Sequence, residues 1–259
     1  MSSAEIIFKP CVVIPVYNHP HKIAGLVARL LDFGLPCILV DDGSAAHCAQ
    51  VLDVIAAENP RVELLRLAQN AGKGVAVCRG FTLAHSKGFT HALQVDADGQ
   101  HDLNDVPAFL ASAQRNPLAV ISGWRSYAAM PPSRRSGRKL TDFWVCINTL
   151  SRAIKDSMCG YRLYPLAPTM QLLARNKIGA RMDFDTDILV RLYWQGLPVE
   201  NIPTRILYQD DIPSHFDIIK DNVRISWMHT RLFFGMLPRI PALVWRNFSN
   251  ARRSKTQRV

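Results

Sequence analysis

Short apolar segments alternate with amphipathic segments along the first 122 residues of this 259-residue chain. The apolar segments are rich in Val, Ile and Leu and end in turn-forming or acidic residues, which is typical of buried strands. Strands are predicted at residues 11–16, 37–41, 62–66, 90–95 and 118–122, and helices at 22–33, 45–57, 74–86 and 103–114. This alternation predicts an α/β fold with a mostly parallel sheet that has helices on both faces.

Two carboxylates, Asp96 and Asp98, directly follow the strand predicted at residues 90–95. Residues i and i+2 of a strand share a face, so the two side chains converge at the end of this strand. A hard cation relieves their repulsion, and Mg²⁺ or Mn²⁺ held by one or two carboxylates plus substrate phosphates is the usual arrangement. Gln100 offers a further neutral oxygen. Taken alone, an Asp-x-Asp pair is also common in turns.

Polar residues gather at two other strand ends. The segment Asp41-Asp42-Gly43-Ser44 ends the second predicted strand. If one of its side chains caps the following helix, Asp41 or Asp42 is left to meet a nucleotide base or ribose. The segment Asn70-Ala71-Gly72-Lys73-Gly74 resembles a phosphate loop without the full motif, and Lys73 is either a phosphate ligand or a solvated lysine.

With Val12-Val13-Ile14-Pro15-Val16-Tyr17-Asn18, these segments resemble the family-2 glycosyltransferases of the GT-A (Rossmann-like) fold, and the resemblance covers residues 10–210. It implies a nucleotide-diphosphate sugar donor and a divalent cation. His19 departs from the family pattern, which has an acidic residue at this position, so the role of that carboxylate is in doubt here. The implied ligands of the nucleotide sugar are Pro15, Tyr17, Asn18, Asp42, Lys73 and Asp96, and those of Mg²⁺ or Mn²⁺ are Asp96, Asp98 and Gln100.

The segment Asp156-Ser157-Met158-Cys159-Gly160-Tyr161-Arg162 resembles an element of the dolichyl-phosphate mannosyltransferase branch, and so does Gln100. Arg162 either donates to a sugar or phosphate oxygen or pairs with Asp156. Residues 123–139 predict a long basic loop, which is either solvated or a flap over phosphates. Because this branch places arginines opposite phosphate groups here, Arg125 is the first candidate and Arg138 the second.

Three acidic residues at alternate positions begin a helix predicted after residue 182: Asp183, Asp185 and Asp187. Acidic residues suit a helix N-terminus regardless of function, but three exceed what capping needs. In the family a carboxylate from this segment reaches the acceptor. Asp185 is therefore the candidate catalytic residue, with Asp183 and Asp187 as alternatives.

The positive charge of the chain lies in its second half. Residues 1–122 hold 9 Lys and Arg against 11 Asp and Glu, whereas the remainder holds 22 against 10. No zinc-finger spacing or aromatic RNA-binding strand accompanies this charge, which argues against nucleic acid. From Asp217 onward, aromatic and basic residues alternate in an amphipathic pattern that ends in Arg252-Arg253-Ser254-Lys255. A helix packed on the core explains the apolar face, but the aromatic and basic bias favours docking on an anionic membrane.

The predicted organisation is a GT-A domain over residues 1–212 and a membrane-docking segment over 213–259. No secretory signal and no apolar run long enough to span a membrane is visible, so a cytoplasmic protein, peripheral on the inner face of the cell membrane, is expected. The six cysteines form no Cys-x-x-Cys and predict buried, reduced thiols.

The predicted activity is inverting sugar transfer from a nucleotide-diphosphate sugar to a lipid-linked acceptor, foremost a polyprenyl phosphate. The alternatives are transfer to a hydroxyl of another lipid or acyl-chain acceptor, for which the segment 213–216 leaves room, and a nucleotidyltransferase. The latter normally has a glycine-rich first loop, whereas this chain has Pro15-Val16-Tyr17-Asn18-His19-Pro20 there. A non-catalytic membrane adaptor would leave Asp96, Asp98 and Gln100 unexplained.

Overall fold

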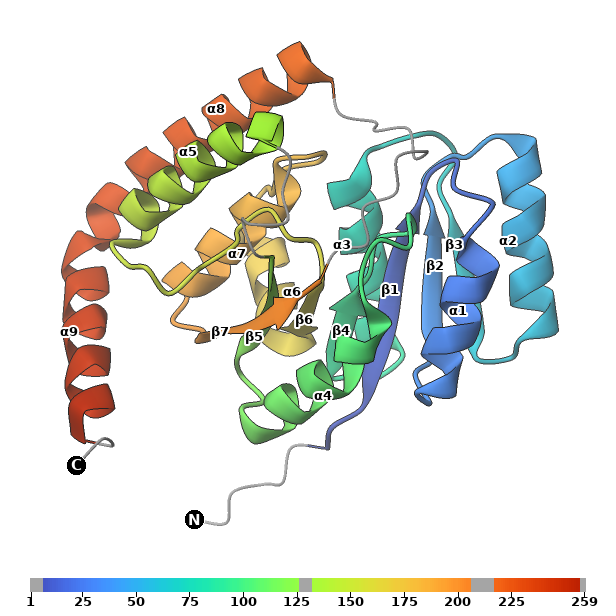
Figure 1. Ribbon diagram of the computed structural model, residues 1–259, viewed down its shortest axis with the longest axis horizontal. Helices are drawn as coiled ribbons and strands as arrows, with labels where there is room; N and C mark the ends of the chain where they lie inside the picture. Colours follow the sequence, from blue (N-terminus) through green and yellow to red (C-terminus); the bar gives the residue numbers. More distant parts are fainter. Residues whose placement is uncertain (1–6, 126–131, 206–216, 257–259) are drawn as a thin grey trace.

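The computed structural model of the chain describes residues 7–125, 132–205 and 217–256 (Figure 1). In this part of the chain, seven strands form one sheet in the order β3-β2-β1-β4-β6-β5-β7. Only β6 runs antiparallel to its neighbours β4 and β5. The strands are β1 (Pro10–Val16), β2 (Cys37–Asp41), β3 (Val62–Arg66), β4 (His91–Gln94), β5 (Val120–Arg125), β6 (Arg162–Pro165) and β7 (Val199–Thr204). The predicted mostly parallel sheet is confirmed.

Helices cover both faces of this sheet, as predicted. One face is covered by α1, α2 and α4, and the other by α3, α6 and α7, with α5 and α8 outside them. The helices are α1 (Ile23–Asp32), α2 (Ala46–Glu58), α3 (Lys73–Ser86), α4 (Val106–Arg115), α5 (Pro132–Thr149), α6 (Leu166–Arg175), α7 (Phe184–Trp194), α8 (Ile218–Met236) and α9 (Ile240–Thr256), with 3₁₀ turns η1 (Leu103–Asp105) and η3 (Leu237–Arg239).

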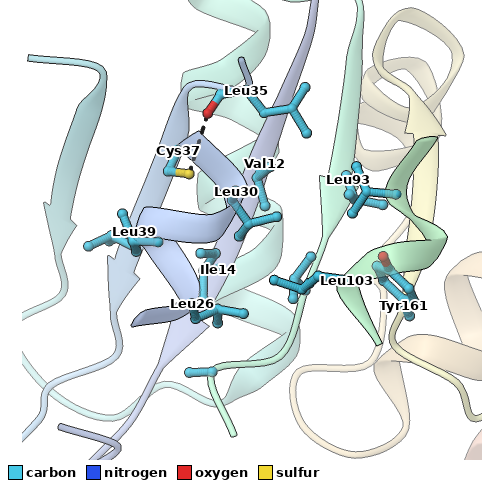
Figure 2. Close-up of a cluster of buried hydrophobic side chains, with 14 of the residues drawn as sticks. Val12, Ile14, Leu26, Leu30, Leu35, Cys37, Leu39, Leu93, Leu103 and Tyr161 are labelled. Atoms are coloured by element: carbon cyan, nitrogen blue, oxygen red, sulfur yellow. Dashed lines mark hydrogen bonds between the residues drawn. The ribbon is translucent and has the colours of Figure 1, made fainter. Parts of the chain in front are cut away.

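Alternate side chains of the central strands enter two separate hydrophobic cores, because successive residues of a strand point to opposite faces. Val12 and Ile14 of β1 pack with side chains of α1 such as Leu26 (Figure 2). Cys11 and Val13 of the same strand pack with α3 on the other face. Because both faces are covered, polar groups can gather at the edge where the strands end.

One edge of the sheet collects the carboxyl ends of the parallel strands. β1 lies parallel to β2 and β4, and β5 points the same way as β4 because β6 is antiparallel to both. β6 therefore begins at the edge where β4 and β5 end, and Arg162 pairs with Gln94 and with Ser122. Ligands of open α/β sheets bind at this edge.

The prediction of a loop over residues 123–139 is wrong at both ends. β5 continues to Arg125, and α5 begins at Pro132, within the predicted loop. Proline is favoured at the first helical position because its missing N–H would have no partner there. Residues 126–131, the centre of the predicted flap, lie outside the described part of the chain.

The predicted C-terminal helix is confirmed as α8, and a second helix, α9, follows it. Asp217 caps α8 by accepting hydrogen bonds from the backbone N–H groups of Ile219 and Lys220. α8 runs beside α5 (Figure 1). α9 is held against the end of α7, where the Arg246 guanidinium lies 3.8 Å from the ring centroid of Tyr193. The domain boundary proposed at residue 213 lies outside the described residues.

None of the described helices is both long enough and apolar enough to cross a membrane. All six cysteines are free, and four of them are buried. Burial raises the pKa of the Cys37 and Cys78 thiols to about 12, so both are protonated near neutral pH. The prediction of buried cysteines is confirmed for four of the six, whereas Cys78 and Cys146 are half-buried.

Candidate active site

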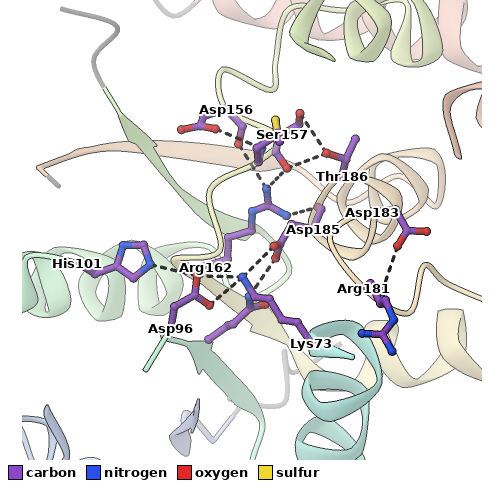
Figure 3. Close-up of polar contacts among 12 residues, drawn as sticks. Lys73, Asp96, His101, Asp156, Ser157, Arg162, Arg181, Asp183, Asp185 and Thr186 are labelled. Carbon is purple, nitrogen blue, oxygen red and sulfur yellow. Dashed lines mark hydrogen bonds and ion pairs between the residues drawn. The ribbon is translucent and has the colours of Figure 1, made fainter. Parts of the chain in front are cut away.

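Three charged side chains from separate elements meet beyond the end of β4 (Figure 3). The Nζ atom of Lys73, the first residue of α3, lies 2.8 Å from Oδ1 and 2.9 Å from Oδ2 of Asp96. The same Nζ lies 3.0 Å from Oδ2 of Asp185, near the start of α7. We call Lys73, Asp96 and Asp185 the acidic triad, because two carboxylates surround one ammonium. The fold thus joins three residues that the sequence predicted for one site.

The acidic triad is enclosed by Gln94 and Gly160. Gln94 of β4 donates from Nε2 to Oδ1 of Asp185 at 3.0 Å. A Cβ atom on Gly160 would lie 2.7 Å from Nζ of Lys73 and 2.8 Å from Oδ2 of Asp96. A side chain at this position would therefore displace the charged groups of the acidic triad.

In the acidic triad, attraction between opposite charges outweighs the effect of burial on the pKa values of Asp96 and Lys73. Burial alone raises the pKa of a carboxyl group and lowers that of an ammonium group. The attraction of Lys73, with a smaller contribution from His101, outweighs burial and holds the pKa of Asp96 well below its usual range. Asp185 and Asp96 likewise hold the pKa of Lys73 above its usual range. Both Asp96 and Lys73 are thus charged at neutral pH.

The loop after β4 carries the predicted metal ligands Asp98 and Gln100. Oδ1 of Asp98 accepts a hydrogen bond from the backbone N–H of Gln100 at 3.0 Å, and both side chains are half-buried. Among the described residues, no group of three or more His, Cys, Asp and Glu could hold a metal ion by itself. This part of the chain therefore shows no closed structural metal site. The oxygen atoms of Asp96, Asp98 and Gln100 are of the kind that Mg²⁺ and Mn²⁺ accept, and their assignment as ligands stays a prediction.

His101 and Tyr161 flank Asp96. Nε2 of His101 lies 3.7 Å from Oδ2 of Asp96, and the His101 ring stacks on Tyr161 with centroids 4.8 Å apart. Within the described part of the chain, four buried polar atoms of this site have no hydrogen-bond partner: Nδ1 of His101, the hydroxyl of Tyr161, Oε1 of Gln94 and Oδ1 of Asp96, which has only its ion pair with Lys73. Unsatisfied buried polar atoms are costly, so these four atoms suit a site that is completed by a ligand or water.

Asp42 orders the loop that precedes Lys73. Its carboxylate accepts hydrogen bonds from Nδ2 of Asn70 and from the backbone N–H groups of Ala71 and Gly72, at 3.0, 2.7 and 2.9 Å. Burial raises the pKa of Asp42, and these bonds partly offset that effect. Asp42 therefore has a structural role in this loop, and its contact with a nucleotide stays a prediction.

The end of β1 is tied to the start of α2. Asn18 has a left-handed backbone with φ of 57°, its N–H donates to Oγ of Ser44, and its Oδ1 accepts from the N–H of Ala45. Asp41 accepts from the N–H of Ser44 at 2.8 Å and pairs with Arg66. The predicted nucleotide ligands Pro15 and Tyr17 are half-buried at the same strand end.

A second charged cluster, Arg125, Arg138 and Asp156, lies at the end of β5. Arg125 donates from Nε and Nη2 to the two carboxylate oxygens of Asp156, at 2.9 and 3.1 Å. Arg138 of α5 pairs with the same carboxylate. We call these residues the basic triad, because two guanidinium groups share one carboxylate. Both arginines predicted to face phosphate groups are thus brought together.

Neither alternative proposed for Arg162 describes its contacts. Its side chain is 0% exposed. The guanidinium donates to the backbone carbonyls of Asp156, Ser157 and Asp185 (Figure 3). It also donates to the hydroxyls of Ser122 and Tyr164. The Asp156 carboxylate pairs with Arg125 and Arg138 instead. Arg162 therefore positions the segment 156–157 against the start of α7, and its donors are turned toward protein atoms.

The structure separates the three acidic residues at the start of α7. Asp187 accepts from the N–H of Gly179 at 2.9 Å and pairs with Arg191, and Asp183 accepts from the N–H of Arg181 at 3.1 Å. Asp185 alone of the three contacts Lys73. The choice of Asp185 as the residue of this segment that belongs to the site agrees with this geometry, and its role in chemistry stays a prediction.

Sequence reasoning did not select Gln94, His101 or Gly160 as site residues. Gln94 carried a usable signal, because it is a polar residue between the apolar residues Leu93 and Val95. His101 directly follows the predicted metal ligand Gln100. Gly160 carried no local signal, since its contacts come from β4 and α3, which are distant in sequence.

The fold and the site define an α/β enzyme that gathers charged groups at the carboxyl edge of its parallel strands. The chain belongs to glycosyl transferase family 2, whose family model matches residues 11–178. It is therefore a glycosyltransferase, as the sequence predicted, and membership of this family sets aside the nucleotidyltransferase and adaptor alternatives.

Curated relatives include lipid-phosphate sugar transferases. The chain is 26% identical over 245 residues to a dolichyl-phosphate beta-glucosyltransferase of Dictyostelium discoideum, covering 84% of this chain and 74% of the relative. It is 30% identical over 213 residues to the polyprenol monophosphomannose synthase of Mycolicibacterium smegmatis, covering 74% and 75% of the two chains. An undecaprenyl-phosphate mannosyltransferase of Micrococcus luteus is 26% identical over 198 residues, covering 74% and 80%.

Solved glycosyltransferase structures share this fold. One is glucosyl-3-phosphoglycerate synthase from Mycobacterium tuberculosis in complex with Mn²⁺, uridine diphosphate and glucosyl-3-phosphoglycerate. It matches 90% of this chain and 80% of its own, with a TM-score of 0.60 and 13% sequence identity. At this identity the likeness concerns the fold, and it confirms the predicted GT-A architecture.

Proposed function

We propose that this glycosyltransferase moves a sugar, with inversion, from a nucleotide-diphosphate sugar to a polyprenyl phosphate. Three relatives carry dolichyl phosphate, undecaprenyl phosphate or polyprenol in their names. The observation that carries the proposal is the presence of two clusters of opposite net charge at one sheet edge, linked by the contacts of Arg162. The donor is bound together with a cation, which suits the acidic triad. The acceptor is itself an anion, which suits the basic triad.

The acidic triad and the neighbouring loop serve the donor. Lys73 presents an ammonium to the diphosphate, where negative charge grows as the sugar leaves. Asp96, Asp98 and Gln100 would hold Mg²⁺ or Mn²⁺, which when bound supplies Lewis-acid stabilisation of the leaving diphosphate. Residues at the ends of β1 and β2 bind the nucleotide of the donor: Pro15, Tyr17, Asn18 and Asp42.

The basic triad serves the acceptor. Arg125 and Arg138 bring two guanidinium groups to the end of β5, and a phosphate monoester matches the fork of guanidinium donors. A polyprenyl phosphate is already anionic near neutral pH, so its oxygen attacks without a general base. Asp185, which accepts hydrogen bonds from Lys73 and Gln94, then acts by holding Lys73 in place.

The direct test is a transfer assay with a panel of nucleotide-diphosphate sugars in the presence of Mn²⁺. Each donor is offered with a polyprenyl phosphate and, in parallel, with the matching polyprenol, which has the same chain and a hydroxyl in place of the phosphate. Sugar incorporation into the phosphate at a rate at least about a hundredfold above the alcohol is expected. Equal incorporation into the alcohol would contradict the assigned acceptor.

We further propose that the exposed apolar face of α5, α8 and α9 docks on an anionic membrane, so that the enzyme is peripheral on the inner face of the cell membrane. Large apolar side chains on all three helices face solvent, among them Leu140, Phe143, Ile219, Val223, Trp227, Phe234, Trp245 and Phe248. Trp227 is 62% exposed and Trp245 is 78% exposed, and the exposed Lys139 and Lys220 lie on the same helices. This pairing of aromatic and basic residues is typical of interfacial helices. The side chains of the basic tail 252–255 lie outside the described residues.

Vesicle co-sedimentation tests this surface. Full-length protein should bind vesicles that contain anionic lipid, more weakly as salt increases. Trp227→Ser combined with Trp245→Ser should reduce binding, and the control Leu118→Ser, which changes an exposed apolar residue before β5, should not. Equal binding by the double variant and the control would contradict the proposal.

A further inference from the structure

Lys73 lies where it contacts a residue predicted to bind the metal. Its ammonium is within 2.9 Å of both carboxylate oxygens of Asp96 and 3.0 Å from Asp185. A divalent cation bound by Asp96 would meet a positive charge on the same two oxygens. Like charges that share a carboxylate repel, so Lys73 and the cation exclude each other from this position.

The surroundings of Lys73 allow it to leave Asp96 without losing all its partners. Asp185 is a second carboxylate in contact with the same ammonium, and Gln94 holds Asp185 in place. The backbone of Gly160 leaves no room for a bulkier group beside Nζ. The side chain of Lys73 is 19% exposed and that of Asp96 is 25% exposed, so both are accessible from solvent.

We propose that Lys73 is the resident counter-cation of Asp96 in the free enzyme and that it competes with the divalent cation for this carboxylate. When the cation takes Asp96, Lys73 keeps its contact with Asp185 and its ammonium turns to the phosphates of the donor. The inference rests on the proposed function for the identity of the donor. The competition between Lys73 and the cation is a property of the protein alone.

This exchange couples the cation and the donor. Without donor, binding of the cation displaces Lys73 from its partner and is correspondingly weak. With donor present, the displaced ammonium gains phosphate oxygens as new partners. Each ligand therefore binds more tightly in the presence of the other, and by linkage the effect is the same in both directions.

The test measures the affinity of the full chain for Mn²⁺ alone, by electron paramagnetic resonance of free Mn²⁺ in the absence of nucleotide. Lys73→Met keeps much of the side-chain length and removes the charge. It is expected to bind Mn²⁺ about tenfold more tightly than the unmodified protein, the size of one charge-assisted hydrogen bond. Lys73→Arg keeps a competing cation and should stay close to the unmodified affinity.

A charge-matched variant separates competition from the general electrostatic field. Lys73→Met with Asp185→Asn leaves the net charge of the acidic triad at that of the unmodified protein but removes the ammonium from Asp96. Competition predicts that this double variant still binds Mn²⁺ several-fold more tightly. A return to the unmodified affinity would overturn the proposal, because the field alone would then explain the single variant. The double variant also avoids two unpaired carboxylates, so the test survives if Lys73→Met does not fold.

Lys87→Met is the matched control at the other end of α3. Lys87 directly follows the helix and pairs with Glu63 on the surface, so its loss should leave Mn²⁺ affinity unchanged. An equal gain in this control would overturn the proposal, and so would a failure of all variants to bind Mn²⁺. Unchanged affinity in the double variant together with sugar transfer in the donor panel would reject the exchange and leave the proposed function standing.

Discussion

The acidic triad and the basic triad both combine positive and negative side chains, but in opposite numbers. In the acidic triad one ammonium, that of Lys73, lies between two carboxylates. In the basic triad one carboxylate, that of Asp156, lies between two guanidinium groups. The formal charges of the three named side chains sum to −1 in the first and +1 in the second. This difference is the basis for the proposal that the first serves the cation-bound donor and the second the anionic acceptor, although both lie at the same edge of the sheet.

The short segment 156–162 connects the two triads. Asp156 is the centre of the basic triad, and Gly160 lies against the acidic triad. Arg162 donates to the backbone carbonyls of Asp156 and Asp185 and so connects the two. The fully buried Arg162 thus holds the backbone of both triads in place through carbonyl groups and not through their carboxylates.

The largest expected effect follows from removing a carboxylate on the acidic side without touching the triad. Asp98→Ala should lower transfer by about a thousandfold or more, since cation binding supplies several kcal/mol of charge stabilisation. Steady-state transfer rates across a Mn²⁺ series measure this. The control is Asp102→Ala, because Asp102 likewise accepts a hydrogen bond from the backbone N–H two residues on. Metal-dependent turnover that persists in Asp98→Ala would remove Asp98 from the metal site.

Gly160→Ala should break the acidic triad by steric displacement. The added methyl group would lie within 2.8 Å of Lys73 Nζ and of Asp96 Oδ2, so the ion pair must shift. A loss of about a hundredfold in kcat/KM is expected with little change in Tm, because misplacement of about 1 Å has this effect on catalysis. Gly25→Ala in α1, where an added Cβ meets nothing within 4 Å, is the control. Equal activity in both variants would show that the triad tolerates displacement.

Arg125→Met should weaken the basic triad selectively. Loss of one charge-assisted contact to a phosphate costs about 1.5–3 kcal/mol, so kcat/KM for the phosphate acceptor should fall by about ten- to a hundredfold. The KM for the donor should stay within about threefold. Lys155→Met serves as control, because Lys155 lies over the ring of Trp124, next to Arg125, and outside the triad. A larger change for the donor than for the acceptor would reverse the assignment of the two triads.

Asp185→Asn should have the smallest effect. With a polyprenyl phosphate there is no proton to remove, so the rate should fall by less than about tenfold, through looser positioning of Lys73. A general base would instead contribute about 10²–10⁴-fold. Single-turnover rates with a phosphate and with a hydroxyl acceptor distinguish these cases. A rate loss of about 10²–10⁴-fold with the phosphate acceptor would mean that Asp185 removes a proton from the acceptor.

Much of the fold and part of the site follow from the sequence because they depend on local patterns. The five strands of the first 122 residues, the intervening helices and the placement of Asp96 after β4 all rest on residue spacing that a strand or helix imposes. Parallel strands also bring their carboxyl ends to one edge, so Asp42, Asp96 and Arg125 could be expected there. Tertiary structure was not needed to place these residues at that edge.

Other features were decided by contacts between segments distant in sequence. The antiparallel strand β6 brings Arg162 to the edge at its beginning, and burial there turns all its donors to the protein. Asp156 pairs with Arg125 and Arg138 and not with Arg162, because the fold brings Arg138 of α5 to the end of β5.

The sequence by itself determined that the chain is an α/β glycosyltransferase with paired carboxylates after a central strand. Only the tertiary structure decided which of Asp183, Asp185 and Asp187 enters the site. A helix turns by about 100° per residue, so residues two apart point to nearly opposite sides, and the packing of α7 selects the side. The tertiary structure also decided that Lys73 lies between Asp96 and Asp185. The ion pair of Lys73 with Asp185 spans 112 residues, so it depends on where the chain folds back and not on local spacing.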